Sequence, residues 1–95
     1  MFARVTPYKM KAGTRDEATA LLHSLKDQIL ALDGMRHFIN VMKADGSGHV
    51  IALVDSEAAA DGNAERVKEI WANFADHLEA VPVPETYDVI ADWTV

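Results

Sequence analysis

The chain has 95 residues and a mass of 10.4 kDa, enough for one domain and too little for two, so we expect a single domain over residues 1–95. Hydrophobic residues make up 49% of the sequence and charged residues 25%, a balance that supports a packed core and excludes a disordered or fibrous chain. A net charge of -6 disfavours nucleic acid as a partner, and no apolar run approaches the ~20 residues that cross a membrane. The absence of cysteine excludes disulfides and thiolate chemistry and favours a cytoplasmic location.

The first third of the sequence predicts a strand followed by a helix. Residues 2–11 form a β-compatible run that ends at Ala12-Gly13. Thr14 and Glu17 have the spacing of a capping box, which places a helix start at Thr14. Apolar residues then recur at helical spacing until the stop signal Asp33-Gly34; they are Ala18, Leu21, Leu22, Leu25, Ile29 and Leu32.

Two apolar runs in the middle of the chain predict an antiparallel hairpin. Residues 35–43 and 49–55 are joined by a segment whose two glycines suit a hairpin loop. A symmetric loop places Val41 opposite Ile51 and Ile39 opposite Leu53, so that both faces of the hairpin are apolar. Each apolar face of the sheet must pack against another layer of structure, and the helices of the chain can cover only one face. We expect a second subunit to cover the other.

The last third predicts a second helix and a final strand. After an irregularity at residues 61–63, a helical stripe runs up to Pro82 and Pro84, which end the helix; its members are Val67, Ile70, Trp71, Phe74, Leu78 and Val81. Residues 87–95 alternate as a strand does. The order β-α-β-β-α-β predicts a ferredoxin-like α+β fold, with a four-stranded antiparallel sheet and two helices on one face.

Three segments resemble the dimeric α+β barrel superfamily and, within it, the antibiotic-biosynthesis-monooxygenase-like proteins. They are the opening strand RVTPYKMKAG (residues 4–13), the link LDGMRHF (32–38) and the end of the third strand, IALVDSEAA (51–59). The resemblance implies a homodimer joined sheet to sheet into a barrel, with a small apolar cleft between the sheet and the helices of each subunit. The activities that the resemblance implies include oxygenation of phenolic or quinol-type aromatics without a cofactor and oxidative opening of haem, and other members of the group have no assigned reaction.

Trp71 and His77 lie near opposite borders of the second helical stripe, where both side chains can rim a cleft. Imidazole changes charge near neutral pH, so His77 is a candidate general base or haem ligand, and Trp71 is a candidate for stacking a planar ligand. The alternative is that Trp71 is an ordinary core residue and that His77 is exposed to solvent, with no role in a site. The haem-opening relatives also use a Trp and a His on this helix, together with an Asn on the first strand where this chain has Thr6.

Other polar and aromatic side chains are candidates for binding a substrate. Asn40 is the polar exception on an apolar face, so its amide either bonds across the dimer interface or contacts a ligand. Three aromatic side chains, Tyr8, Tyr87 and Trp93, line either the cleft or the dimer interface. For the cleft we select Tyr8, Phe38 and Phe74. The four histidines lack the spacing of a helical zinc pair, so no metal site is predicted.

The sequence favours a homodimer that binds a small planar aromatic molecule and oxygenates it without metal, flavin or other cofactor. His77 would assist proton removal and Trp71 would hold the ring, because an ionised phenol or quinol passes an electron to oxygen once it is deprotonated, oriented and desolvated. Asn40, Phe74, Tyr8 and Phe38 would bind the substrate. The alternative is a dimer that binds a small molecule or a partner without chemistry, and haem binding through His77 is a third hypothesis.

Overall fold

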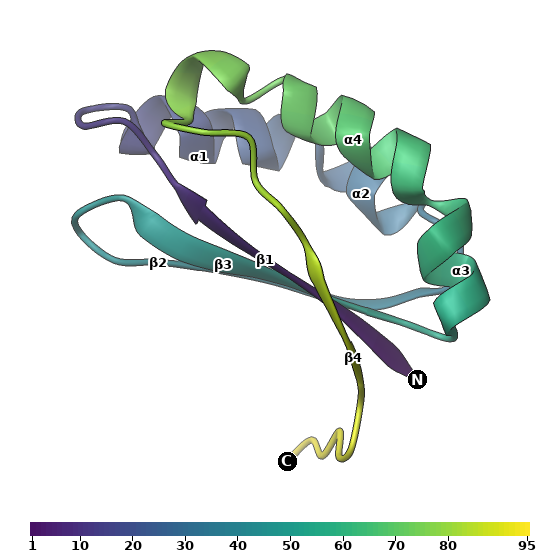
Figure 1. The fold of residues 1–95 in the computed structure, drawn as a ribbon. Coiled ribbons are helices and arrows are strands. Elements are labelled where there is room, and N and C mark those ends of the chain that lie inside the picture. The colour runs from purple at the N-terminus through teal and green to yellow at the C-terminus, as the bar shows by residue number, and fades with distance from the viewer.

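A computed structural model describes all 95 residues and shows one antiparallel sheet with every helix on the same side of it (Figure 1). The sheet has the order β2-β3-β1-β4, formed by β1 (Phe2–Lys9), β2 (Met35–Met42), β3 (Ser47–Val54) and β4 (Glu85–Asp88). The helices are α1 (Arg15–Ser24), α2 (Lys26–Leu30), α3 (Glu57–Gly62), α4 (Ala64–Ala72) and the 3-10 helix η1 (Ala75–His77). The predicted ferredoxin-like α+β fold is confirmed. None of these helices has the length and apolar character needed to span a bilayer.

The predicted first helix is present but its start and its continuity differ from the prediction. The helix does begin after Thr14, yet the capping box is wrong, because the Thr14 hydroxyl donates to the Lys11 carbonyl at 2.8 Å and caps no helical N–H. The helix is also divided into α1 and α2 at Leu25, which has a non-helical backbone. Leu25 nevertheless remains buried, so the apolar stripe stays continuous across the break.

The hairpin has the predicted faces but a different register. Ile39 pairs with Ile51 and Val41 with His49, so the expected pairing is wrong by two residues. The loop is shorter than predicted because the Lys43 N–H donates to the Ser47 carbonyl and Gly46 adopts a φ of +91°, which starts β3 two residues early. A shift of two preserves which side chains share a face, since strand side chains alternate with a period of two.

The second helix and the last strand are shorter than predicted. The helix ends at Ala72, where the Asn73 amide donates to the carbonyls of Glu69 and Ile70 and satisfies two of the last free acceptors. The chain then turns through η1 toward β1, and Val81 is left 87% exposed. Only Glu85–Asp88 pairs with β1, so the expected strand over residues 87–95 is wrong beyond Asp88.

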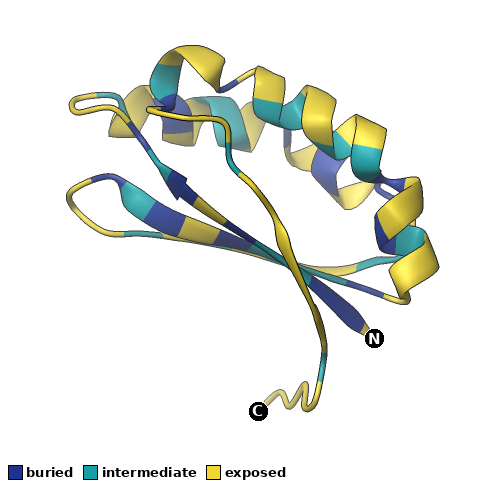
Figure 2. Cartoon of the chain, viewed as in Figure 1, coloured by how far each residue is buried: buried dark blue, intermediate teal, exposed yellow.

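The core lies between the sheet and the helices (Figure 2). Its main cluster combines side chains from β1, β3 and the helical layer: Tyr8, Met10, Ala18, Leu25, Ile29, Val50, Phe74 and Leu78. The opposite face of the sheet is uncovered, and Ile39 and Val41 on β2 are about half exposed there. The two apolar faces predicted for the hairpin are therefore present, and one chain covers only one of them.

Candidate functional site

A cavity of about 70 Å³ lies between the inner face of the sheet and the helices. Its lining has 16 residues, of which 13 are hydrophobic. Five of the six predicted site residues line it together: Tyr8, Phe38, Asn40, Trp71 and Phe74. They come from β1, β2, α4 and the turn after α4, so the fold brings together side chains that are far apart in sequence. An apolar pocket with a few polar groups is the usual form of a small-molecule site.

One wall of the cavity is aromatic. The Trp71 ring centroid lies 5.9 Å from that of Tyr8 at an interplanar angle of 52° and 6.0 Å from that of Phe74 at 60°. Tilted and edge-to-face contacts of this kind stabilise aromatic clusters beyond the burial of their area. The rings therefore hold one another in place and present a firm apolar surface to a ligand.

Tyr8 and Asn40 form a polar pair within this apolar lining. The Tyr8 hydroxyl donates to Asn40 Oδ1 at 2.6 Å and lies 3.2 Å from the Val41 carbonyl. Burial raises the pKa of Tyr8 above its ordinary value, while the charge of Arg15 and the hydrogen bond with Asn40 act in the opposite direction. Tyr8 is therefore a neutral phenol at physiological pH. The Asn40 Nδ2 group makes no hydrogen bond in the chain and remains available as a donor to a ligand.

The raised pKa of Tyr8 predicts an alkaline loss of stability. The phenol binds its proton more tightly when folded than when unfolded, so its contribution is complete below pH 10 and is lost as the pH rises through the higher folded pKa. We expect the tyrosinate absorbance of the Tyr87→Phe variant, which retains only Tyr8, to develop above pH 10 and together with unfolding. The hydrogen bond to Glu85 also raises the pKa of Tyr87, so Tyr8→Phe is the matched control. Titration of Tyr8 below pH 10 in folded protein would contradict this assignment.

Arg4 and Thr6 also line the cavity. The sequence predicted neither as a site residue, although Thr6 occupies the position of the Asn that the haem-opening relatives use. Arg4 Nη1 reaches the Ala60 carbonyl only at 3.5 Å, and Arg4 Nε is buried without any hydrogen-bond partner. No carboxylate lies within ion-pair distance of this guanidinium, whereas Arg36 and Arg66 each pair with an aspartate. The signal was available in the sequence, because Arg4, Thr6 and Tyr8 alternate along one strand and therefore share its inner face.

A larger groove of about 660 Å³ adjoins the cavity. Helix α4 and the segment from Leu78 to Pro84 form its sides, and in Figure 1 this segment runs from η1 down to β4. Four residues line both spaces: Arg4, Thr6, Val67 and Trp71. The groove therefore meets the cavity where the guanidinium and the indole lie, and it is a route from the surface to the buried site.

His77 is the one predicted site residue that the structure does not bring to the cavity. Its side chain lines neither the cavity nor the groove, and its Nδ1 lies 4.0 Å from Glu17 Oε2 near the start of α1. The cause is the early end of α4, because a residue placed on that helix by extrapolation falls instead in η1. No group of three or more potential metal ligands is present in the chain.

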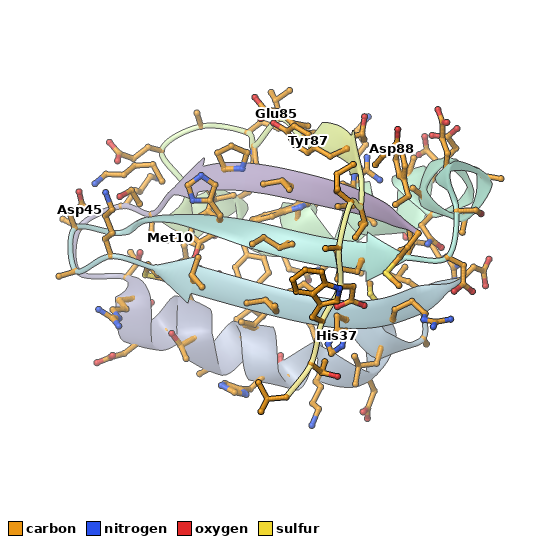
Figure 3. All side chains as sticks on the ribbon, turned by 90° about the horizontal axis from the view of Figure 1, so that it is seen from below. Met10, His37, Asp45, Glu85, Tyr87 and Asp88 are labelled. Carbon is orange, nitrogen blue, oxygen red and sulfur yellow. The ribbon has the colours of Figure 1, made fainter.

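Tyr87 and Trp93 lie away from the cavity. Tyr87 is on β4, opposite Ala3, and is half exposed on the outer face of the sheet (Figure 3). Trp93 belongs to the segment after β4 and is 91% exposed. Of the two locations considered for these rings, the cleft is therefore excluded within a single chain.

Comparison with solved structures yields neighbours of similar fold at low sequence identity. No protein-family profile and no curated protein matches the chain. A protein of unknown function from Nitrosomonas europaea superposes with a TM-score of 0.82 at 18% identity, covering 99% of this chain and 93% of the other. A second protein from that organism, provisionally assigned as an antibiotic biosynthesis monooxygenase, superposes with a TM-score of 0.79 at 13% identity, covering 96% and 100%.

A third neighbour, from Caulobacter crescentus, carries the same provisional assignment. It superposes with a TM-score of 0.78 at 17% identity and covers 95% of this chain and 90% of its own. Likeness at this level of identity reports architecture, and activity has to be argued from the site itself. The chain therefore has the ferredoxin-like α+β fold of the antibiotic-biosynthesis-monooxygenase-like proteins, as its sequence resemblance predicted.

Proposed function

We propose that the protein is a cofactor-independent monooxygenase that acts on a small phenolic or quinol-type aromatic bound between the sheet and the helices. The observation that carries this proposal is the cavity itself, whose lining combines the rings of Tyr8, Trp71 and Phe74 with the polar Tyr8–Asn40 pair. A pocket filled completely by Trp71 and Phe74 would instead have favoured a purely structural role. The neighbours named as monooxygenases support the proposal at the level of the fold.

The arrangement matches what such a reaction needs from a protein. The substrate ring packs against Trp71, and Asn40 Nδ2 donates to the substrate hydroxyl oxygen, which favours its ionised form. A carbon that exchanges two hydrogens for one oxygen atom loses four electrons. These electrons reduce O₂ completely. One oxygen atom enters the product, the other leaves as water together with the two displaced hydrogens, and no external reductant is required. The apolar lining keeps bulk water from the ionised ring.

The volume of the cavity restricts how the substrate binds. A cavity of about 150 Å³ holds one benzene molecule, whereas this cavity has about 70 Å³. The adjoining groove offers about 660 Å³. We therefore expect the reacting edge of the substrate to enter the cavity while the rest of the molecule lies in the groove, with Trp71 at the junction.

Oxygen uptake tests the proposal. We expect protein treated with a metal chelator to consume O₂ with at least one member of a panel of hydroquinones, hydroxynaphthoquinones and anthrone-like phenols. Asn40→Ala and Trp71→Ala should each lower kcat/KM by about tenfold or more, because each removes a contact worth about 1.4 kcal/mol. Uptake that is equal in wild type and both variants would refute a reaction in this cavity.

The His77→Ala variant distinguishes a reaction that uses only the cavity residues from one in which His77 is the general base, as the sequence predicted. His77 lines neither space, so we expect its variant to retain the wild-type rate. Loss of the rate in this variant would instead return the role of general base to His77. Tight binding of panel members without any O₂ consumption would favour a non-enzymatic small-molecule-binding protein.

We also propose that two copies associate through the outer faces of their sheets. Side chains at Ile39, Val41 and Tyr87 are about half exposed on this face. After β4 the chain leaves the sheet and passes below the outer face, and there Ile90 and Trp93 are more than nine-tenths exposed (Figures 1 and 3). The chain leaves both its outer sheet face and its C-terminal arm exposed. In a symmetric dimer, the same two surfaces of the second copy would bury them.

A further inference from the structure

The guanidinium of Arg4 contains a buried nitrogen that the rest of the chain leaves without a hydrogen-bond partner. It has five N–H donors and makes one long hydrogen bond, 3.5 Å to the Ala60 carbonyl, while its Nε is the only buried side-chain nitrogen or oxygen without a partner. Buried donors in native proteins are almost always paired. An unpaired donor beside a ligand cavity is therefore a group whose partner is expected to arrive with the ligand.

The surroundings of Arg4 leave room for such a partner. On the sheet Arg4 lies between Ala52 of β3 and Thr86 of β4, whose side chains are both small. Besides Arg4, the charged residues that line the adjoining groove are Glu65 and Lys68 on α4. Neither the carboxylate of Glu65 nor the ammonium of Lys68 forms an ion pair with another group. Glu65 therefore does not neutralise Arg4, and the positive charge remains available where the cavity and the groove meet.

We infer that the substrate of this site is an aromatic carboxylic acid whose carboxylate is bound by Arg4. The inference rests on the proposed function and narrows it to a substrate class. The planar guanidinium offers two parallel donors that match the two oxygens of a carboxylate, and a turn of the side chain toward the cavity brings Nε into this pair. The ring then extends from Arg4 along Trp71 toward Asn40, so the charged group lies at the junction and the reacting edge lies in the cavity.

Calorimetric binding of two matched probes tests this inference without relying on turnover. The probes are 6-hydroxy-2-naphthoate and its neutral analogue 6-hydroxy-2-naphthamide, which share ring, hydroxyl and shape and carry the hydroxyl at the opposite end of the ring from the carboxylate or amide. Wild type should bind the carboxylate about 10- to 100-fold more tightly than the amide, the range expected for a charge-assisted hydrogen bond. Arg4→Met should remove this preference while leaving the amide Kd unchanged, and Arg4→Lys should retain part of it.

Arg36→Met is the matched control, because Arg36 is exposed and pairs with Asp55 away from the cavity. It should bind both probes as wild type does. An unchanged amide Kd in Arg4→Met also shows that the variant is folded. Equal binding of the two probes by wild type, or a carboxylate preference that survives in Arg4→Met, would overturn the role of Arg4 and leave the aromatic site standing. Binding of neither probe by wild type would overturn the inference together with the proposed site.

Discussion

Gly48→Ala is expected to lower the free energy of unfolding by about 3 kcal/mol, at the upper end of the usual range for overpacking. Gly48 lies opposite Tyr8 in the register of β1 and β3. A Cβ atom added there would lie 2.5 Å from the Tyr8 hydroxyl oxygen and 2.6 Å from its Cζ, and it would also meet the Val41 carbonyl oxygen. Real Cβ atoms essentially never show such contacts, so either the Tyr8 ring or the β2 backbone has to move.

Gly48→Ala is also expected to impair ligand binding in the cavity. Displacement of Tyr8 breaks its hydrogen bond to Asn40 and shifts its contact with Trp71, so residual folded protein should bind aromatic probes poorly. Thermal and urea unfolding measure the first effect, and a loss of 3 kcal/mol corresponds to a Tm lower by on the order of 15 °C for a domain of this size. Calorimetry with the two naphthalene probes measures the second.

Gly62→Ala is the control for Gly48→Ala. Gly62 is the last residue of α3, and a Cβ added there has no atom within 4 Å. An alanine in this helical position should therefore leave stability unchanged or raise it by about 0.5–1 kcal/mol. A double variant, Gly48→Ala with Tyr8→Ala, should lose less stability than the sum of the two single variants, because the ring contact is removed. Additive losses would show that Tyr8 is not what Gly48 accommodates.

The inner face of the sheet was predictable because strand side chains alternate strictly. Asn40 lies on the same face as Phe38 in the sequence and in the structure, and this survived a register error of two residues. Of the two roles considered for Asn40, its position in the cavity lining, where its Oδ1 accepts from Tyr8, favours contact with a ligand. Site residues on β1 and β2 were therefore accessible from periodicity alone.

The second helical layer was less predictable because apolar spacing does not report where a helix ends. Phe74 and Leu78 continue the helical stripe and both are buried, yet the chain around them is a turn and an extended segment. Hydrogen bonds from Asn73 to the end of α4, and from the Lys11 N–H to the His77 carbonyl, direct the chain toward β1 instead. The Asn73 contacts are local, but the Lys11–His77 hydrogen bond joins residues far apart in the chain and has no signature in the local sequence, so His77 was misplaced.

Ile39→Glu is expected to convert a dimer into a monomer. Ile39 is 47% exposed at the centre of β2, on the face that we propose to be shared by two copies. A symmetric interface contains each substitution twice, and an unpaired charge buried in an apolar interface costs about 3 kcal/mol or more. The Kd for association should rise by at least about a hundredfold. Sedimentation or light scattering should give twice 10.4 kDa for wild type and 10.4 kDa for the variant.

Leu30→Glu provides the matched control, because Leu30 is 52% exposed but lies on α2, on the other side of the sheet. This variant should remain dimeric.

Truncation after Asp88 removes the exposed arm that contains Trp93. The truncation should weaken association less than Ile39→Glu does, since it deletes apolar area without burying a charge. The cavity lies on the inner face, so monomeric Ile39→Glu should still bind 6-hydroxy-2-naphthamide. A wild-type mass of 10.4 kDa would refute the shared face, and loss of probe binding in the monomer would show that the second copy completes the site.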